Sequence, residues 1–353
     1  MARVVCFIGI AALFAPASCQ AQTFTTLVNF NGTNGYVRSA LVQGTDGNFY
    51  GTGEGGGANG SGTIFRLTPA GKLTTLYSFC SQVNCADGGS PQGLIQASDG
   101  NFYGTTNVGG ADLYGTVFKF TPGGTLTTLY SFCSQANCAD GAEPLAGLVQ
   151  GTDGNLYGTT SWGGLACYDP TSCAGGTVFR VAPGGALTTL YSFCSQLSVS
   201  GAPCTDGSTP LAGLIQALDG DLYGATDLGG DTGGGTVFKI TPGGMLTKLY
   251  SFGGGEDGED PQAGLIQATD GNFYGTQTFL AERLGLIPGL SVGWSSRSRR
   301  PARSQLCTAF VPRPGAPTAR SLILGFFKRL TGTSTGPPRM GDRMAAELPS
   351  RSC

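Results

Sequence analysis

The sequence predicts an all-β protein: a β-propeller-like array of four-stranded antiparallel blades, with four full units, a partial fifth and a disordered C-terminal tail. The string DGNFYGT at residues 46–52 returns four more times with small changes, at intervals of 51 to 66 residues. Two other strings, GTIF at 62–65 and LTTLYSF at 73–79, recur between these copies in the same order. No part of residues 22–276 shows the 3.6-residue apolar spacing of a long helix.

The second unit shows the expected strands in order, at residues 93–97, 101–105, 115–120 and 126–132. Aromatic and β-branched residues fill these runs, and turn-forming residues separate them. Asp99-Gly100 predicts a two-residue hairpin turn between the first two strands. The segment 122–124 (PGG) predicts the turn between the last two, with glycine in the left-handed position.

A single four-stranded sheet of this size cannot bury both faces, so neighbouring units must stack. Four antiparallel strands repeated about every 50 residues are typical of propeller blades. WD40 blades are shorter and carry signatures that are absent here. A parallel β-helix would have shorter rungs, and a sandwich would not repeat so regularly.

The repeat resembles the bacterial choice-of-anchor tandem repeat (GloVer) family of exported proteins. The resemblance rests on the strings GLIQATDGNFYGT, GTVFKITPGG and LTKLYSF, and it covers residues 24–276. It implies an exported, surface-displayed repeat protein whose members carry varied C-terminal anchors. It implies no catalytic residues.

The chain begins with features of an export signal. Arg3 precedes an apolar run from Val4 to Phe14, and small residues near position 21 suit cleavage. Residues 1–21 are therefore expected to be a signal peptide and residues 22–276 the repeat domain, in a secreted, cell-surface or periplasmic protein. A lipid anchor on Cys19 is the alternative. No later run is long and apolar enough to predict a transmembrane helix.

Eight of the twelve cysteines form local pairs within the repeats. Such pairs in an exported chain predict disulfide bonds. A zinc site is the alternative, but the pairs belong to different units, so we expect no metal centre. The predicted pairs are Cys80 with Cys85, Cys133 with Cys138, Cys167 with Cys173, and Cys194 with Cys204.

Few residues point to a ligand. Trp162 is the only tryptophan of the repeat region and begins an inserted loop, where it could contact carbohydrate. The acidic run at Asp257, Glu259 and Asp260 could hold a weak surface Ca²⁺, although it lacks the spacing of an EF-hand. The repeated Asp-Gly at 87–88 is interpreted as a turn in which the aspartate bonds its own loop. The repeated tyrosines, such as Tyr103, are interpreted as core residues rather than a sugar-stacking ring.

The chain contains no histidine, which excludes Ser-His-Asp and Cys-His catalysis. The leading hypothesis is a non-enzymatic binding or scaffold module for a glycan or protein partner, without a cofactor and without nucleic acid at the repeat domain. The alternative is an extracellular carbohydrate-active enzyme that uses Asp/Glu acid-base chemistry, with Glu143, Asp227 and Asp231 as candidates. The spacing assigns no catalytic pair.

Residues 277–353 differ from the rest in composition. Residues 1–276 carry 8 Lys+Arg and 19 Asp+Glu, for a net charge of −11, and residues 277–353 carry 12 and 3, for +9. The change falls inside a repeat motif, directly after Thr276. Three interpretations stay open: a basic arm for an anionic partner, a solvated disordered tail, and out-of-frame translation of further repeats.

Overall fold

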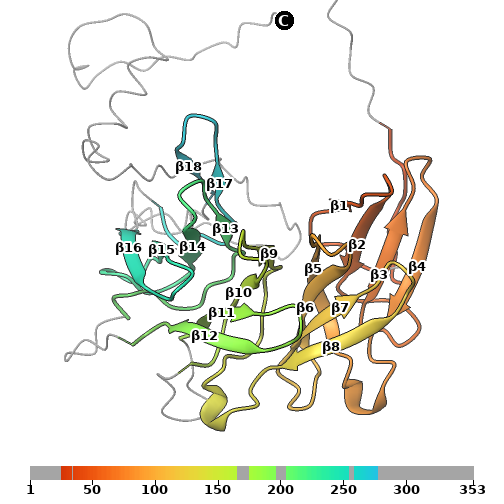
Figure 1. Cartoon of the computed structure of the whole chain (residues 1–353), viewed down its shortest axis with the longest axis horizontal. Helices are drawn as coiled ribbons and strands as arrows, with labels where there is room; N and C mark the ends of the chain where they lie inside the picture. Colours follow the sequence, from red (N-terminus) through yellow and green to blue (C-terminus); the bar gives the residue numbers. More distant parts are fainter. Residues whose placement is uncertain (1–24, 34, 165–174, 196–203, 254–257, 277–353) are drawn as a thin grey trace, which may run out of the picture.

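The computed structural model describes residues 25–33, 35–164, 175–195, 204–253 and 258–276. Figure 1 shows five sheets arranged around an arc, with the first at the N-terminal end and the two-stranded last one opposite it. The predicted fold class is confirmed: the described residues form four-stranded antiparallel blades and contain no α-helix. None of their helical segments is long and apolar enough to cross a membrane.

Each blade is a meander in which the strands follow one another from the innermost to the outermost position. The first blade holds β1 (Val42–Gln43), β2 (Phe49–Gly53), β3 (Thr63–Leu67) and β4 (Leu73–Ser78). The second holds β5 (Gly89–Gln96), β6 (Phe102–Val108), β7 (Thr116–Phe120) and β8 (Leu126–Ser131). The third holds β9 (Val149–Gln150), β10 (Leu156–Thr160), β11 (Thr177–Val181) and β12 (Leu187–Ser192). The fourth holds β13 (Ile215–Gln216), β14 (Leu222–Thr226), β15 (Thr236–Ile240) and β16 (Leu246–Ser251). The fifth holds β17 (Ile266–Gln267) and β18 (Phe273–Tyr274).

The core lies between blades rather than within them. The phenylalanine that directly follows the outer strand packs edge-on against the central phenylalanine of the next blade. Phe79 lies on Phe118 and Phe132 on Phe179, with ring centroids 5.2 and 5.1 Å apart, and Phe193 lies on Phe238 in the same way. These rings are fully buried. Because every blade buries its faces against its neighbours, the repeat must stack to be stable.

The expected two-residue turn at Asp99-Gly100 is wrong in length. The amide of Gly100 donates to the carbonyl of Ala97, and the amide of Ala97 donates to the carbonyl of Asn101. This is a three-residue hairpin loop, with Gly100 at φ 79° in the left-handed position that closes it. The turn at 122–124 has the same form and confirms the expected left-handed glycine at Gly124, with φ 94°.

The aspartate of this hairpin explains the repeated tyrosine. Asp99 accepts hydrogen bonds from the Asn101 amide at 3.0 Å and from the Tyr103 hydroxyl at 2.8 Å. Burial opposes ionisation of Asp99, but these hydrogen bonds, with Lys119, lower its pKa to about 2. Tyr103 itself is fully buried, so the tyrosine series belongs to the core.

A glycine in the first blade leaves a buried hydroxyl without a partner. Thr106 and Thr116 pair their hydroxyls at 2.8 Å, but the first blade has Gly53 in place of the first threonine, and Oγ1 of Thr63 has no partner. A β-carbon at Gly53 would stand 2.9 Å from Oγ1 of Thr63 and 3.1 Å from Cα of Gly35, but Thr106 packs in the same way against Gly88 in the second blade. We therefore expect Gly53→Thr to raise the free energy of unfolding by up to about 1 kcal/mol, because it restores this bond and removes a strand glycine. Urea unfolding measures it. Gly53→Val is the control, and an equal gain from valine would contradict the role of the hydroxyl.

Candidate functional site

The two ends of the propeller differ. One end carries the short Asp-Gly and Pro-Gly turns, and the other carries the long loops between the second and third strands together with the cysteine-containing connections between blades. We call the second end the loop face. The turns at the first end satisfy their own hydrogen bonds and repeat with little change, whereas the loops vary from blade to blade.

Disulfides fix the cysteine connections of the loop face. Three of the predicted bonds are present: Cys80–Cys85, Cys133–Cys138 and Cys194–Cys204. The fourth predicted pair, Cys167 and Cys173, lies outside the described residues.

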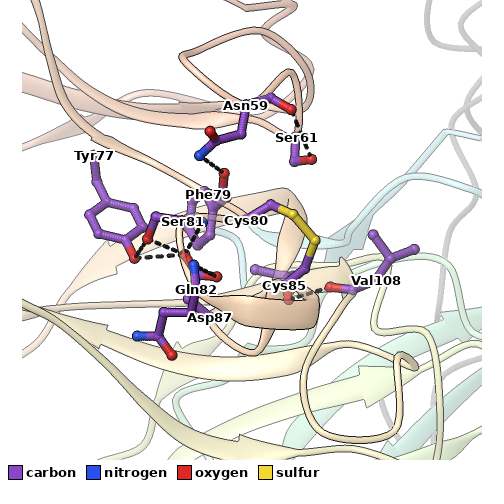
Figure 2. The surroundings of a disulfide bond; sticks show 11 residues. Asn59, Ser61, Tyr77, Phe79, Cys80, Ser81, Gln82, Cys85, Asp87 and Val108 are labelled. Carbon is purple, nitrogen blue, oxygen red and sulfur yellow. Dashed lines mark hydrogen bonds between the residues drawn. A yellow bond between two sulfur atoms is a disulfide. The ribbon is translucent and has the colours of Figure 1, made fainter.

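Asp87 does more than the sequence interpretation allowed. Its carboxylate bonds its own loop, as interpreted, and accepts hydrogen bonds there from the Ser81 amide and hydroxyl at 2.9 and 2.8 Å and from the Gln82 amide at 3.2 Å. It also accepts one from Tyr77 Oη, outside the loop, at 2.7 Å (Figure 2). Asp87 is fully buried. It therefore anchors the whole disulfide loop to the outer strand of the preceding blade, because Tyr77 belongs to β4.

At the inner rim of the loop face, each connection between blades places one side chain on a left-handed backbone. These residues precede the proline of the connection and have φ between 53° and 55°. They are Ser90, Glu143, Thr209 and Asp260. Non-glycine residues in this region cost of order 1 kcal/mol each, and such strain gathers at functional sites.

The strained conformation aims each amide at the neighbouring blade. The Glu143 amide donates to the carbonyl of Tyr114 at 2.9 Å, and the Asp260 amide donates to that of Gly234 at 3.0 Å. This contact joins successive blades while the side chains vary from one connection to the next. The sequence offered no signal for it, because positive φ at a non-glycine residue follows from a bond between blades.

A second rim position lies at the end of the second strand of each full blade, four residues after the repeated tyrosine. It holds Glu54, Asn107, Ser161 and Asp227. The two positions meet: the Ser161 hydroxyl donates to the Glu143 carbonyl at 2.8 Å, and the Asp227 amide donates to the Thr209 carbonyl at 3.0 Å. Together they form a polar rim of two side chains per blade.

Two carboxylates of the rim are neighbours between the fourth and fifth blades. Burial raises the pKa of Asp227, against a hydrogen bond from Gln262, and its Oδ1 is buried without a partner. The pKa of Asp260 is also raised, first by burial and then by the charges of Asp227 and Glu259. The structure thus brings Asp227 within electrostatic range of Asp260, one residue of the predicted acidic run.

The other predicted acidic residues fall elsewhere. Asp231 forms an ion pair with Lys248 at 2.5 Å on the surface. Glu143 lies at the rim of the third blade, and Asp257 lies outside the described residues. Among the residues that the structure describes, no group of three potential metal ligands gathers.

Exposed apolar side chains surround the polar rim. Val108, Trp162 and Leu228 occupy one equivalent position, directly after the second rim position, and are 45%, 38% and 43% exposed. Tyr36 and Tyr114 add exposed rings at 64% and 38%. Trp162 therefore occupies a repeated apolar position, whereas the prediction from sequence treated it as a feature of one loop alone.

A sequence model of the Gloeobacter/Verrucomicrobia repeat matches residues 12–205 and 176–285. The chain belongs to this repeat family. The matched ranges cover most of the blades described above and confirm the predicted family resemblance. No curated protein matches the chain.

Several solved structures are similar to this repeat protein at low identity and low TM-score. The extracellular domain described as part of a hybrid two component system from B. thetaiotaomicron is 12% identical, with a TM-score of 0.42 over 67% of this chain. This chain spans 25% of that one. A protein of unknown function from Dyadobacter fermentans is 13% identical, with a TM-score of 0.42, covering 70% of this chain and 76% of that one. The endo-arabinase from Bacteroides thetaiotaomicron is 14% identical, with a TM-score of 0.35, covering 70% and 92%. Likeness this distant says nothing about what the repeat protein binds.

Replacing Asp227 tests whether its ionised carboxylate lowers the free energy of unfolding at neutral pH. Its folded pKa lies above its unfolded value, so the stabilising proton is present at low pH and lost as pH rises through the folded pKa. We therefore expect Asp227→Asn to stabilise the protein at pH 7, with the gain shrinking as the pH falls through the range of carboxyl titration. Thermal unfolding at pH 3 to 8 measures it, with the exposed Asp112→Asn as control. A loss of stability at pH 7 would contradict the assignment.

Proposed function

We propose that this repeat protein is an exported binding module whose loop face takes a neutral, hydroxyl-rich glycan. The observation that carries the proposal is the set of exposed aromatic rings, among them Trp162, that stand around a rim carrying carboxylates. Carboxylates accept hydrogen bonds from hydroxyl groups, and aromatic faces pack against the apolar faces of sugar rings. The disulfides of the loop face fit an oxidising compartment.

The charge of the rim favours a neutral ligand over an anionic one. Glu54, Glu143, Asp227 and Asp260 all lie at the rim, and the described ion pair there is between Arg38 and Glu54 at 2.8 Å. A polyanion would meet repulsion from these carboxylates, whereas sugar hydroxyls would donate to them.

Binding to a glycan array, followed by titration calorimetry of the strongest ligand, tests the proposal. We expect Trp162→Ala to weaken binding about tenfold or more, because buried aromatic contacts dominate binding energy. Leu218→Ala is the matched control, since Leu218 is 91% exposed on the opposite end and should leave binding unchanged. Equal affinity of Trp162→Ala and the unaltered chain would rule out the loop face as the glycan site.

One observation favours the alternative, an acid-base glycan hydrolase. The pKa values of Asp227 and Asp260 are both raised by burial, and the charge of Asp227 also raises that of Asp260; a carboxyl with a raised pKa suits a general acid. Release of reducing ends from the bound glycan would support it, provided Asp227→Asn abolishes the turnover while binding persists. Binding without turnover supports the module.

A further inference from the structure

Residues 25–30 pack like the outer strand of a blade that precedes the first. Phe30 lies against Phe65 with ring centroids 5.0 Å apart, close to the 5.1 Å between Phe132 and Phe179. The carbonyl oxygen of Leu27 lies 3.0 Å from where a β-carbon on Gly71 would be. Leu129 and Leu190 stand at 2.8 Å from the corresponding positions of Gly185 and Gly244. Residues 25–30 (TTLVNF) thus occupy the place that TTLYSF occupies in the full blades.

The fifth blade has its two inner strands but, among the described residues, no outer strands. β17 and β18 form its inner two strands, and Phe273 stacks on Tyr223 of the fourth blade with ring centroids 4.1 Å apart. In every full blade a strand of the GTVF type pairs with the second strand, as Thr116–Phe120 does with β6. Among the described residues, the edge of β18 has no such neighbour. The arc in Figure 1 stays open between β18 and residues 25–31.

The codons that specify residues 277–353 limit what a second reading frame of the same nucleotides can encode. Consider the frame that begins at the third base of each codon. The codons of residues 292–310 (VGWSSRSRRPARSQLCTAF) then allow the reading GVVFKIAPAGxLTTLYSF. Residues 176–193 of the third blade read GTVFRVAPGGALTTLYSF. The fifth and ninth positions match other blades, which have Lys119 and Ala70 there. Only the second position matches no blade, because the base before TG gives valine, leucine or methionine rather than threonine.

Residues with few codons constrain this reading strongly. Trp294 has the single codon TGG, and its last base with TC from Ser295 gives valine where the repeat has Val178. Cys307 ends in T or C, which with AC from Thr308 gives only tyrosine or histidine where the repeat has Tyr191.

The same frame continues through the next two motifs. The codons of residues 310–319 (FVPRPGAPTA) allow CSQAxCADG, and residues 133–141 read CSQANCADG. The codons of residues 324–337 (LGFFKRLTGTSTGP) allow GLLQASDGNFYGT, and residues 93–105 read GLIQASDGNFYGT. The motifs follow one another in the order of the repeat.

The shift is located by the last intact motif. One base inserted after the codon of Thr276 makes the next codon end in CA, which is threonine when that base is A. The codon after it is then asparagine or aspartate. Thr106-Asn107 and Thr226-Asp227 follow the same motif in the second and fourth blades.

We infer that residues 277–353 are the out-of-frame translation of further repeats, caused by one nucleotide missing near codon 277. In the restored frame the chain adds the third and fourth strands of the fifth blade against β18. It then forms another disulfide connection and begins a sixth blade, to which residues 25–30 contribute the outer strand. The loop face gains the rim positions of these blades.

Sequencing the gene through codons 270–353 tests the inference directly. We expect codons that spell the repeat strings in the restored frame, and mass spectrometry of the protein from its source should find the peptide that contains LTTLYSF after Thr276. Codons that do not spell these strings would overturn the inference.

Expression of two altered genes tests the structural part. One base inserted after codon 276 should raise the melting temperature of the full chain and make its unfolding more cooperative. The control is the same insertion after codon 311, which restores the frame only beyond the fifth blade and should bring no such gain. Equal melting temperatures of the two products would overturn the role of the restored strands at β18. Glycan binding is measured separately, so loss of that function would leave this result intact.

Discussion

Replacing Asp87 with alanine is expected to lower the free energy of unfolding by about 3 kcal/mol, because several buried donors lose their common acceptor. Tyr77, Ser81 and Gln82 all donate to this carboxylate, which is fully buried. Burial alone would raise the pKa of Asp87, but the hydrogen bonds outweigh it and hold the pKa below its ordinary value. Urea unfolding at pH 7 measures the change.

The sign of the pH dependence gives a second readout for Asp87. A carboxyl with a lowered folded pKa contributes stability that is present above its unfolded pKa and lost as pH falls through the folded value. The difference between the unaltered chain and Asp87→Ala should therefore shrink below about pH 4. Ser81→Ala, which removes one hydroxyl donor, is the control and should cost about 1 kcal/mol. If Asp87→Ala lowered the free energy of unfolding by less than about 1 kcal/mol more than Ser81→Ala does, Asp87 would not be the anchor of the loop.

Gly158→Ala is expected to destabilise the third blade by about 3 kcal/mol, through overpacking. A β-carbon at this position would stand 2.5 Å from Cζ of Phe179 and 2.8 Å from Cδ2 of Leu148, both of which are buried. Gly104 and Gly224 meet the corresponding Phe118 and Phe238 in the same way. The second glycine of the DGNFYGT motif, Gly158 in this blade, therefore leaves the space that the ring of the central phenylalanine fills.

Thermal and urea unfolding of the variant measure this effect. Gly184→Ala is the matched control, because a β-carbon there meets nothing within 4 Å. It should change the free energy of unfolding by no more than about 0.5 kcal/mol. A Gly158→Ala protein as stable as this control would show that the core between the blades relaxes freely.

The strands of each blade could be predicted because their signals are local. The strings GTVF and LTTLYSF carry β-branched and aromatic residues between turn formers, and the second-blade strands at Thr116–Phe120 and Leu126–Ser131 fall where the sequence placed them. The hairpin at Asp99-Gly100 was placed correctly but given one residue too few, since the amide of Ala97 bonds to Asn101 beyond the pair that carries the turn signal.

The candidate site was only partly predictable. Trp162, Val108 and Leu228 each lie five residues after the repeated tyrosine, so aligning the repeats would have shown that they share a position. Nothing in the spacing showed that Asp260 and Asp227 interact, because they belong to different loops and no repeat relates them.

The sequence by itself determined the repeat, the class of its strands, the cysteine pairs of the connections and the family. Each of these depends on residues close together in the chain, and each is written several times over. Only the tertiary structure decided that Asp87 holds a disulfide loop, that Glu143 and Asp260 adopt left-handed backbones, and that Asp227 faces a neighbouring carboxylate. The physical reason is that these features arise where one blade meets the next, so their energies depend on stacking rather than on any single unit.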